Sequence, residues 1–282
     1  MVILRPVQAT DARELFPLIY GTSVTDTLAW DGPNSYEEFE QSLVEREQQT
    51  RLSLRHVFTI IETESEKPAG IISIRPDAQN FRGEIGLWLG EPYQGKGYGT
   101  YAVRKIVEYG FKILGMEKIE AWVYTGNRAS RWIFEKNGFS LEGTIRSALL
   151  KHGQPQDDWL LGLTRPEYDA WQKVILHLAS ERDWKAAQAD GAYNSASLKS
   201  EVFIHCSRPE QILDVANRFY LGAQNLFILW VELDRLQPVV RWEPIDGDDY
   251  PHVYGPINLD AITAVTPYPS DTDGRFRQFP RR

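Results

Sequence analysis

Residues 94–99 read Gln94-Gly95-Lys96-Gly97-Tyr98-Gly99. They follow an apolar, strand-like segment at 84–89 and open a helical segment that runs to about Leu114. Glycines at this spacing let the chain turn tightly, so several backbone N–H groups can face one anion. The positive end of the following helix adds to that attraction. We therefore predict that residues 94–99 bind a pyrophosphate group.

Strands and helices alternate around this loop. Asp11 and Glu14 have the spacing of a capping box, and Ser35 begins a second helix with the same signature. The alternation predicts a mixed α/β or α+β domain. The expected strands are 2–7, 56–62, 69–74, 84–89, 119–124, 141–149 and 159–163, and the expected helices begin near 10, 35, 97 and 128.

The pattern restarts after residue 167. Strands are expected at 174–178, 202–206 and 226–233, with helices at 180–189 and 209–220. From Arg235 onward Pro, Asp and Gly are frequent, which predicts loops. We therefore predict two domains, residues 1–170 and 174–282.

Composition excludes several classes of function. The 282 residues carry a formal net charge of -8, which disfavours binding to the phosphate backbone of a nucleic acid. No apolar run approaches the ~20 residues that cross a bilayer, and the chain does not open with a signal-peptide pattern. One cysteine, Cys206, excludes an intrachain disulfide and a multi-cysteine zinc site. We expect a cytoplasmic protein that binds no nucleic acid, membrane or metal.

Three segments carry a family resemblance. They are Gly83–Tyr93, the loop 94–99, and 126–139 with its Gly126-Asn127-Arg128-Ala129-Ser130. Together they resemble the GNAT superfamily of acyl-CoA-dependent N-acetyltransferases, in particular the ribosomal-protein alanine acetyltransferase branch, which includes spermidine and drug acetyltransferases. The resemblance covers about residues 1–168. It implies a GNAT fold with a splayed mixed sheet, acetyl-CoA as acyl donor and a primary amine as acceptor.

The resemblance also implies roles for single residues. The loop 94–99 would hold the pyrophosphate of CoA. The backbone of Leu87-Trp88-Leu89 would lie at a strand bulge and bind the pantetheine arm and the thioester oxyanion. Asn127 would bond the pantetheine, or else only cap the following helix. Ser130 and Phe134 would lie beside the thiol.

Two positions depart from the family pattern. Phe134 stands where many members have a tyrosine that protonates the leaving thiolate. Phenylalanine cannot do so, and water, Tyr93 or Tyr98 would have to supply the proton. Tyr101 stands where this branch often has glutamate.

Several carboxylates are candidates for the general base. They are Glu84, Glu120 and the pair Asp157–Asp158, and the base must reach the amine directly or through one water. Glu84 begins the strand that faces the family's acceptor cleft. Trp30 and Asp31 resemble part of the acceptor loop, where an aromatic ring and a carboxylate would suit a cationic amine. An ordinary turn is the alternative for that segment.

The second half resembles another family. The carrying residues include His177, Trp184, Glu201–Ser207, Gln211 and Pro251–Pro256. They resemble the bacterial domain-of-unknown-function family nine hundred fifty-two, whose fold is grouped with ADP-ribosyltransferases. This implies a split mixed sheet and a nucleotide-like ligand. Val202 departs from the family, which usually has glycine there.

Polar residues recur within apolar strands of this half. Burying such a group without a partner costs about 1–3 kcal/mol, so we expect a polar pocket, with a structural network as the alternative. Cys206 alternates with its neighbours and is expected in the core. The predicted pocket residues are His177, His205, Ser207, His252 and Tyr254.

These observations predict an acetyl-CoA-dependent N-acetyltransferase. The acceptor would be a protein N-terminus, a polyamine or a small-molecule amine that attacks the thioester directly. The C-terminal domain would bind a ligand or recognise the substrate. Assembly into a homodimer is compatible with the sequence. The alternative is an acyl-CoA sensor whose C-terminal domain carries the activity or recognition.

Overall fold

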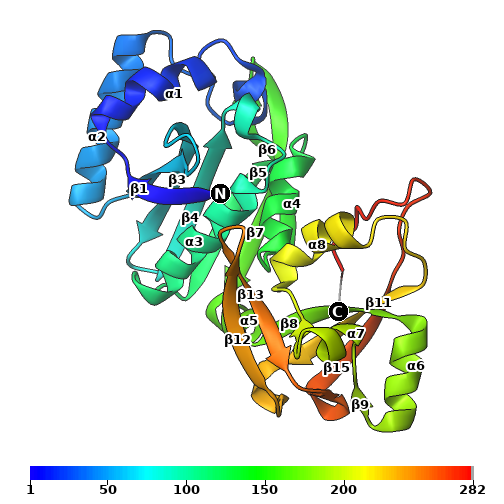
Figure 1. The fold of residues 1–282 in the computed structure, drawn as a ribbon. Coiled ribbons are helices and arrows are strands. Elements are labelled where there is room, and N and C mark those ends of the chain that lie inside the picture. The colour runs from blue at the N-terminus through cyan, green and yellow to red at the C-terminus, as the bar shows by residue number, and fades with distance from the viewer. Residues whose placement is uncertain (281–282) are drawn as a thin grey trace. The chain divides into compact units, whose positions relative to one another are not determined.

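One seven-stranded sheet organises the first part of the chain (Figure 1). Its order is β1-β2-β3-β4-β5-β7-β6. Neighbouring strands are antiparallel except β4 and β5, which are parallel, so the sheet is mixed as predicted. The strands are β1 (Val2–Pro6), β2 (His56–Glu62), β3 (Pro68–Asp77), β4 (Arg82–Leu89), β5 (Lys118–Tyr124), β6 (Ser140–Lys151) and β7 (Gln154–Thr164).

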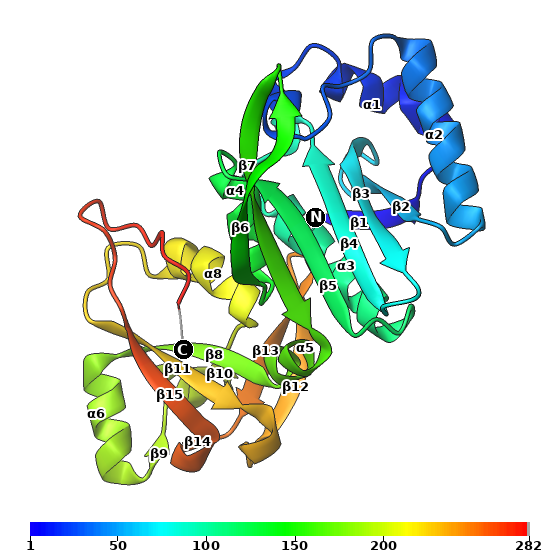
Figure 2. The ribbon, with the colours of Figure 1, turned by 180° about the vertical axis from the view of Figure 1, so that it is seen from behind.

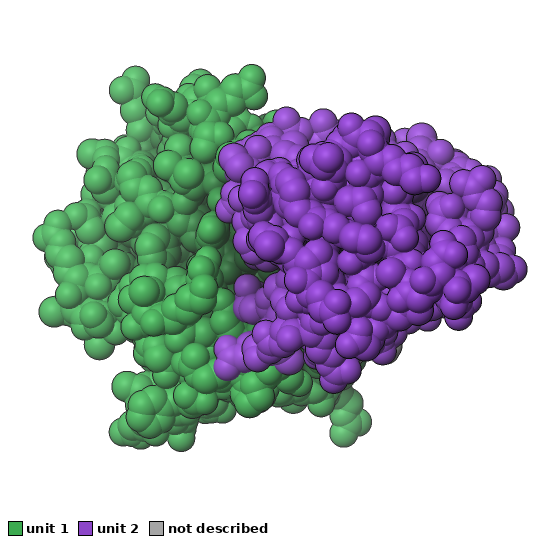
Figure 3. Space-filling model, turned by 60° about the horizontal axis from the view of Figure 1, so that its bottom comes forward, with its two compact units in different colours: residues 1–168 green, residues 169–282 purple. Residues whose placement is uncertain are grey.

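This computed structural model describes residues 1–280. The chain divides into two compact units, which are described separately here (Figure 3). Unit 1 comprises Met1–Tyr168, and unit 2 begins at Asp169.

The β4 and β5 strands separate toward their carboxyl ends. They pair only from Arg82–Ile85 against Lys118–Ala121, although β4 continues to Leu89 and β5 to Tyr124. Figure 2 shows the two ends apart. The register of β3 with β4 runs without a shift, with Ile72 opposite Leu87 and Gly70 opposite Leu89. The bulge expected at Leu87-Trp88-Leu89 is therefore wrong, and the splay alone opens the sheet.

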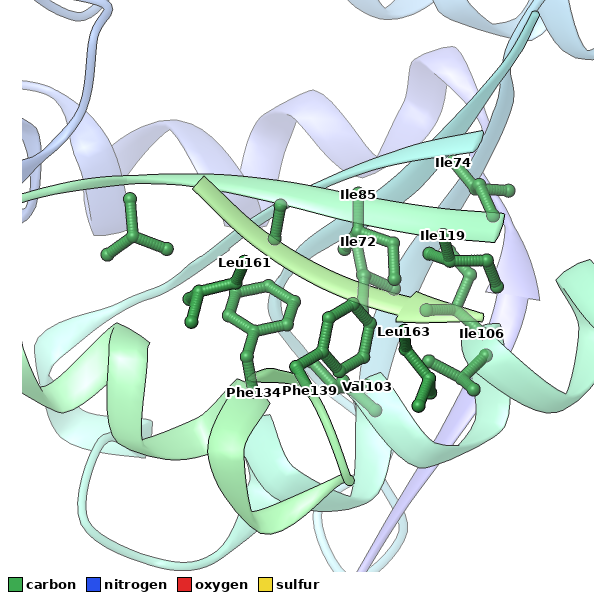
Figure 4. Close-up of a cluster of buried hydrophobic side chains, with 14 of the residues drawn as sticks. Ile72, Ile74, Ile85, Val103, Ile106, Ile119, Phe134, Phe139, Leu161 and Leu163 are labelled. Atoms are coloured by element: carbon green, nitrogen blue, oxygen red, sulfur yellow. The ribbon is translucent and has the colours of Figure 1, made fainter. Parts of the chain in front are cut away.

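Helices cover both faces of this sheet. Ile72 and Ile74 pack with α3 and α4, whereas Ile71 packs with α1 and α2. Figure 4 shows Val103 and Ile106 of α3 against Ile72, Ile85 and Ile119. Because both faces are buried, β3 reads as a continuous apolar run. The helices and 3-10 turns are η1 (Ala9–Asp11), α1 (Ala12–Ile19), η2 (Ser23–Thr27), α2 (Tyr36–Arg51), η3 (Glu91–Tyr93), α3 (Tyr98–Lys112), α4 (Arg128–Lys136) and α5 (Arg165–Gln172).

The helix starts follow the predicted caps only in part. The Ser35 hydroxyl accepts the backbone N–H of Glu38 at 3.2 Å and caps α2 as predicted. The capping box expected from Asp11 and Glu14 is wrong, because the Asp11 side chain does not cap α1. The Asp11 carboxylate instead accepts the Gln8 N–H at 3.0 Å and the hydroxyl of Thr59 at 2.6 Å. It therefore joins the first turn to β2.

Unit 2 contains three small sheets, with orders β15-β11-β8, β10-β13-β12 and β14-β9. All of their pairings are antiparallel, so the sheet is split as expected but not mixed. The strands are β8 (Val174–Ser180), β9 (Ala192–Tyr193), β10 (Ile204–His205), β11 (Leu226–Glu232), β12 (Val239–Ile245), β13 (Asp248–Tyr254), β14 (Ile257–Asn258) and β15 (Ile262–Tyr268). The helices and 3-10 turns are α6 (Glu181–Asp190), α7 (Ala196–Ser200), η4 (Pro209–Gln211), α8 (Ile212–Phe219), η5 (Leu233–Arg235) and η6 (Leu259–Ala261).

Two predictions for unit 2 are wrong. The region after Arg235 contains β12, β13 and β15. Pro244 and Pro267 lie on the edge strands β12 and β15, where proline is tolerated. The strand expected at 202–206 is reduced to β10, because Val202 has φ 65. The family's usual glycine fits this left-handed backbone without strain. The Val202 side chain is 68% exposed.

Candidate functional site

A cavity of about 360 Å³ lies in unit 1, at the separated ends of β4 and β5. Several predicted site residues line it, namely Trp30, Glu84, Leu87, Trp88, Asn127, Ser130, Phe134 and Asp158. The loop before α2, helix α2 itself and the strands β2, β3, β5 and β6 also contribute, through Thr27, Arg46, Arg55, Val57, Ser73, Trp122, Tyr124 and Leu149. The lining joins segments that are far apart in the sequence.

The glycine loop has the backbone that a phosphate cradle needs. Gly95 has φ 72 and Gly97 has φ 79, and Gly97 is the N-cap of α3. No atom lies within 4 Å of a Cβ built at either glycine. Among residues 1–280, no acceptor is bonded to the backbone N–H groups of Gly95, Gly97 or Gly99. A left-handed turn with free amides at a helix N-terminus fits the pyrophosphate of acetyl-CoA.

Other members of the loop have structural partners. The Gln94 side chain donates to the backbone carbonyl of Leu89 at 2.9 Å, which ties the loop to the end of β4. A Cβ on Gly99 would lie 2.7 Å from Ile133 Cδ1, so this glycine also allows α3 and α4 to pack closely. Lys96 Nζ lies 3.7 Å from the Glu62 carboxylate.

Neither tyrosine proposed as a proton donor lines the cavity. The Tyr98 hydroxyl donates to Glu62 at 2.6 Å, and this hydrogen bond raises the pKa of Tyr98 to about 12. Tyr93 lies beneath Lys96, whose Nζ is 5.5 Å from the ring centroid. Burial raises the pKa of Tyr93.

Helix α4 begins at the cavity. The Asn127 side chain accepts the backbone N–H of Ser130 at 2.9 Å and so caps α4. The capping alternative for Asn127 is therefore present, and Asn127 also lines the cavity. Phe134 is buried against Phe139, with ring centroids 5.2 Å apart, and closes one wall.

The carboxylates predicted as base candidates have different surroundings. Glu84 lines the cavity and forms an ion pair with Arg75 at 2.5 Å. Glu120 is not among the lining residues, and it pairs with Lys118 at 2.9 Å. Asp158 lines the cavity, is 7% exposed, and its Oδ1 has no hydrogen-bond partner among residues 1–280. Burial, and then the charge of Asp157, raise the pKa of Asp158.

Trp30 and Asp31, the predicted acceptor segment, both contact other side chains of the protein. Lys151 Nζ donates to Asp31 Oδ1 at 2.5 Å, and Asp31 is not among the lining residues. Arg46 lies over the Trp30 ring, with its guanidinium carbon 5.8 Å from the centroid. Sequence reasoning missed Arg46 and Arg55, because neither belongs to a motif. The sequence did offer one signal for Arg55, namely its position immediately before an apolar strand.

In unit 2 the predicted pocket residues have protein partners. His177 is 5% exposed, with Nδ1 2.7 Å from the His205 carbonyl and Nε2 2.9 Å from the Tyr193 hydroxyl. His205 Nε2 lies 2.9 Å from Glu201. The backbone of buried Ser207 exchanges two hydrogen bonds with Leu176. These partners satisfy both ring nitrogens of the buried His177 without a ligand.

A second cluster surrounds Glu243. Its carboxylate contacts His252 Nδ1 at 2.5 Å and accepts the Tyr254 hydroxyl at 2.7 Å. Phe203 stacks on His252 with centroids 4.1 Å apart.

Cys206 is buried, as predicted. Within residues 1–280, no three His, Cys, Asp or Glu side chains are grouped so as to hold a metal ion. No helix there has both the length and the apolar character of a membrane span.

Comparisons with known proteins agree with this geometry. The GNAT acetyltransferase domain family matches residues 1–140, and the family described as a protein of unknown function (DUF952) matches residues 178–265. The chain is 30% identical over 169 residues to the uncharacterized N-acetyltransferase YoaA of Bacillus subtilis (strain 168), covering 58% of this chain and 94% of that protein. It is 26% identical to the spermidine N(1)-acetyltransferase of Escherichia coli (strain K12), covering 61% of this chain and 91% of that protein.

A solved structure has the same fold as unit 1. The spermidine N-acetyltransferase of Vibrio cholerae, in complex with CoA and spermine, superimposes with a TM-score of 0.54. It is 19% identical, and the match covers 59% of this chain and 97% of that one. With the glycine cradle at the start of α3 and the cavity between β4 and β5, the chain belongs to the GNAT family of N-acetyltransferases, enzymes that use acetyl-CoA as acyl donor.

Proposed function

We propose that unit 1 transfers the acetyl group of acetyl-CoA to a primary amine by direct attack in the cavity, with Asp158 as general base. The loop 94–99 would hold the pyrophosphate, and the cavity at the separated strand ends would receive the thioester and the amine. One observation carries the choice of base. Asp158 lines the cavity and its buried Oδ1 has no partner among residues 1–280.

The other carboxylates are less suited to this role. An amine is protonated at neutral pH and must lose a proton before its nitrogen can attack. Glu84 already forms an ion pair with Arg75 at 2.5 Å, so its carboxylate has a partner within the protein. Burial raises the pKa of Asp158, which brings the carboxylate nearer to the pH range in which a base works well.

The reaction then needs no acyl-enzyme. The amine nitrogen forms a bond to the carbonyl carbon as the carbon–sulfur bond of the thioester breaks. Asp158 accepts the proton lost by the amine, and the leaving thiolate takes a proton from water, since Phe134 has none to donate. The lone cysteine, Cys206, belongs to unit 2 and is buried, and burial raises the pKa of its thiol.

Asp158→Asn tests the base. We expect kcat for thiol release to fall by about 100-fold or more, with the calorimetric affinity for acetyl-CoA unchanged. In the wild type, kcat/KM should rise with pH through the raised pKa of Asp158, and the variant should lose this acidic limb. Asp77→Asn, at the exposed end of β3, is the matched control and should retain activity.

The opposite pattern would assign the base elsewhere. If Asp158→Asn kept its activity while Glu84→Gln lost turnover but not acetyl-CoA affinity, Glu84 would be the base. Acetyl-CoA binding without thiol release on any amine would favour the acyl-CoA sensor.

For unit 2 we propose an accessory role in recognising a ligand or substrate. All residues assigned to the transfer belong to unit 1. The cluster of Phe203, His252, Tyr254 and Glu243 supports recognition, because it combines aromatic rings with a partly exposed carboxylate. The sheets of unit 2 are antiparallel and not mixed, so they lend no support to the ADP-ribosyltransferase-like fold expected for it.

A further inference from the structure

We infer that the amine acceptor carries a carboxylate, and that Arg46 and Arg55 bind it in the cavity. An amino acid is the simplest acceptor of this kind. The inference rests on the proposed function, because it places the acceptor in the same cavity as the acetyl transfer. It concerns the class of acceptor, which the family resemblance leaves open between protein N-termini, polyamines and small amines.

Arg46 carries a positive charge that forms no ion pair within the described residues. Its side chain lines the cavity from α2 and forms no ion pair or side-chain hydrogen bond with any residue of 1–280. The Arg46 guanidinium carbon lies over the Trp30 ring, 5.8 Å from the ring centroid. Burial lowers the pKa of Arg46 to about 10; the charge of Arg55 acts in the same direction, and the charge of Glu45 opposes them. A partly buried guanidinium that forms no ion pair with the described residues is costly, and a bound carboxylate would offset that cost.

Arg55 adds a second positive charge to the same lining. Its Nε and Nη2 donate to the Ser73 hydroxyl at 3.2 and 3.0 Å. A hydroxyl orients the guanidinium but does not neutralise it. Burial and the charge of Arg75 lower the pKa of Arg55, and Glu84 opposes them. Because Glu84 is already paired with Arg75, it only partly compensates Arg55.

The remaining groups of the lining agree with an anionic acceptor group. The Trp88 side chain lines the cavity, and its buried indole N–H has no acceptor among the described residues. Asp158 is the remaining carboxylate of the lining, and its pKa is raised rather than lowered. The lining therefore holds two guanidinium groups and an unused N–H donor beside Glu84, which is paired with Arg75, and Asp158, which is assigned as the base.

A cationic acceptor is not favoured by the same residues. The aromatic face of Trp30, which would suit an ammonium group, is covered by Arg46. The carboxylate of Asp31 is held by Lys151. A polyamine would thus bring further positive charge toward two guanidinium groups, and like charges at short range repel. A carboxylate can instead form paired hydrogen bonds with a guanidinium.

The test compares acceptors that differ only in the carboxylate. Thiol release from acetyl-CoA is measured with a panel of amino acids, each beside its carboxamide, and with spermidine. We expect kcat/KM to be at least about 10-fold higher for the acid than for the amide, which corresponds to one charge-assisted hydrogen bond. Spermidine should be the poorer acceptor. Equal values for acid and amide, or a preference for spermidine, would overturn the inference.

Variants assign the effect to the two arginines. Arg46→Gln and Arg55→Gln should raise KM for the acid and bring the ratio of acid to amide toward one, with acetyl-CoA affinity unchanged. Arg46→Lys should restore part of the preference. Arg51→Gln, on the same helix but exposed and paired with Glu47, is the matched control. A ratio that is unaffected in both glutamine variants would also overturn the inference.

Calorimetry separates this inference from the proposed function. If no acceptor releases thiol, the proposed transfer fails, yet binding of acid and amide to the CoA-bound protein can still be measured. Preferential binding of the acid that is lost in Arg46→Gln would support the anion site. Absent or equal binding of both would contradict it.

Discussion

Burial and hydrogen bonding hold His177 in one tautomer. The His205 carbonyl, 2.7 Å from Nδ1, can only accept, so Nδ1 carries the proton. Nε2 then accepts from the Tyr193 hydroxyl at 2.9 Å. Burial lowers the pKa of His177 to about 4, and the hydrogen bond to the His205 carbonyl opposes this only in part. His177 is therefore neutral in the folded protein at neutral pH.

This lowered pKa predicts a loss of stability in acid. Above the ordinary histidine pKa of 6.5, folded and unfolded chains bind the same number of protons at His177. Below it, only the unfolded chain is protonated, so the free energy of unfolding falls between pH 6.5 and about 4. From pH 7.5 to 4.5, His177 should contribute a loss of roughly 2 to 3 kcal/mol.

Urea unfolding at these two pH values measures that loss. His177→Gln should show a smaller loss than the wild type, because glutamine binds no proton. His152→Gln, at the exposed turn between β6 and β7, is the control and should match the wild type. The same loss in all three proteins would argue that other groups cause the acid sensitivity.

At the scale of elements, the start of α3 carries the proposed donor site. The glycine loop combines left-handed φ angles at Gly95 and Gly97 with a helix N-terminus and with backbone amides that have no acceptor among residues 1–280. The Gln94 side chain fixes this loop to the end of β4. The loop and the cavity are therefore built on the same strand, β4, which would keep the proposed pyrophosphate and thioester sites at a constant spacing.

A charge at Gly97 should abolish donor binding. Asp and Asn both tolerate a left-handed backbone better than other residues, and the space around Gly97 is open. Gly97→Asp and Gly97→Asn therefore differ mainly in a negative charge beside the pyrophosphate. By calorimetry we expect the Asp variant to lose at least about 100-fold in acetyl-CoA affinity, and the Asn variant about 10-fold or less. Equal losses would show that backbone strain, and not charge, limits binding.

At the scale of the whole molecule, each unit has its own core. Unit 1 buries two apolar clusters on opposite faces of its sheet, and unit 2 buries a separate cluster around Ile175, Leu229 and Val253. The YoaA protein matches unit 1 over 94% of its own length. A protein of about this size therefore exists without unit 2.

We predict that residues 1–172 fold and bind acetyl-CoA without unit 2. This range keeps α5, whose Tyr168 stacks on Phe111 with centroids 4.6 Å apart. Arg165 of the same helix donates to the Phe111 and Met116 carbonyls. Circular dichroism melting and calorimetry should show a cooperative transition and an acetyl-CoA affinity close to that of the full chain. Residues 1–164 should melt at a lower temperature. Failure of both chains to fold would make unit 2 part of the folding unit.

Local signals by themselves determined much of unit 1. The segment 94–99 predicted a phosphate loop, the strand expected at 56–62 matches β2, and the helix expected to begin near 128 matches α4. Gly138 follows the end of α4 with φ 88, a backbone that glycine adopts without strain. Such features depend on residues within one or two turns of chain, where backbone sterics and periodicity decide the conformation.

Only the tertiary structure decided which charged groups are free. Lys151 binds Asp31 across 120 residues of sequence, and Arg75 forms an ion pair with Glu84. In the described part of the chain, Asp158 keeps one oxygen without a hydrogen-bond partner. Each pairing follows from strand register and helix packing, which bring side chains together whatever their distance in sequence. A carboxylate that looks available in the sequence is therefore a base or an ion-pair partner only once the fold has chosen its neighbours.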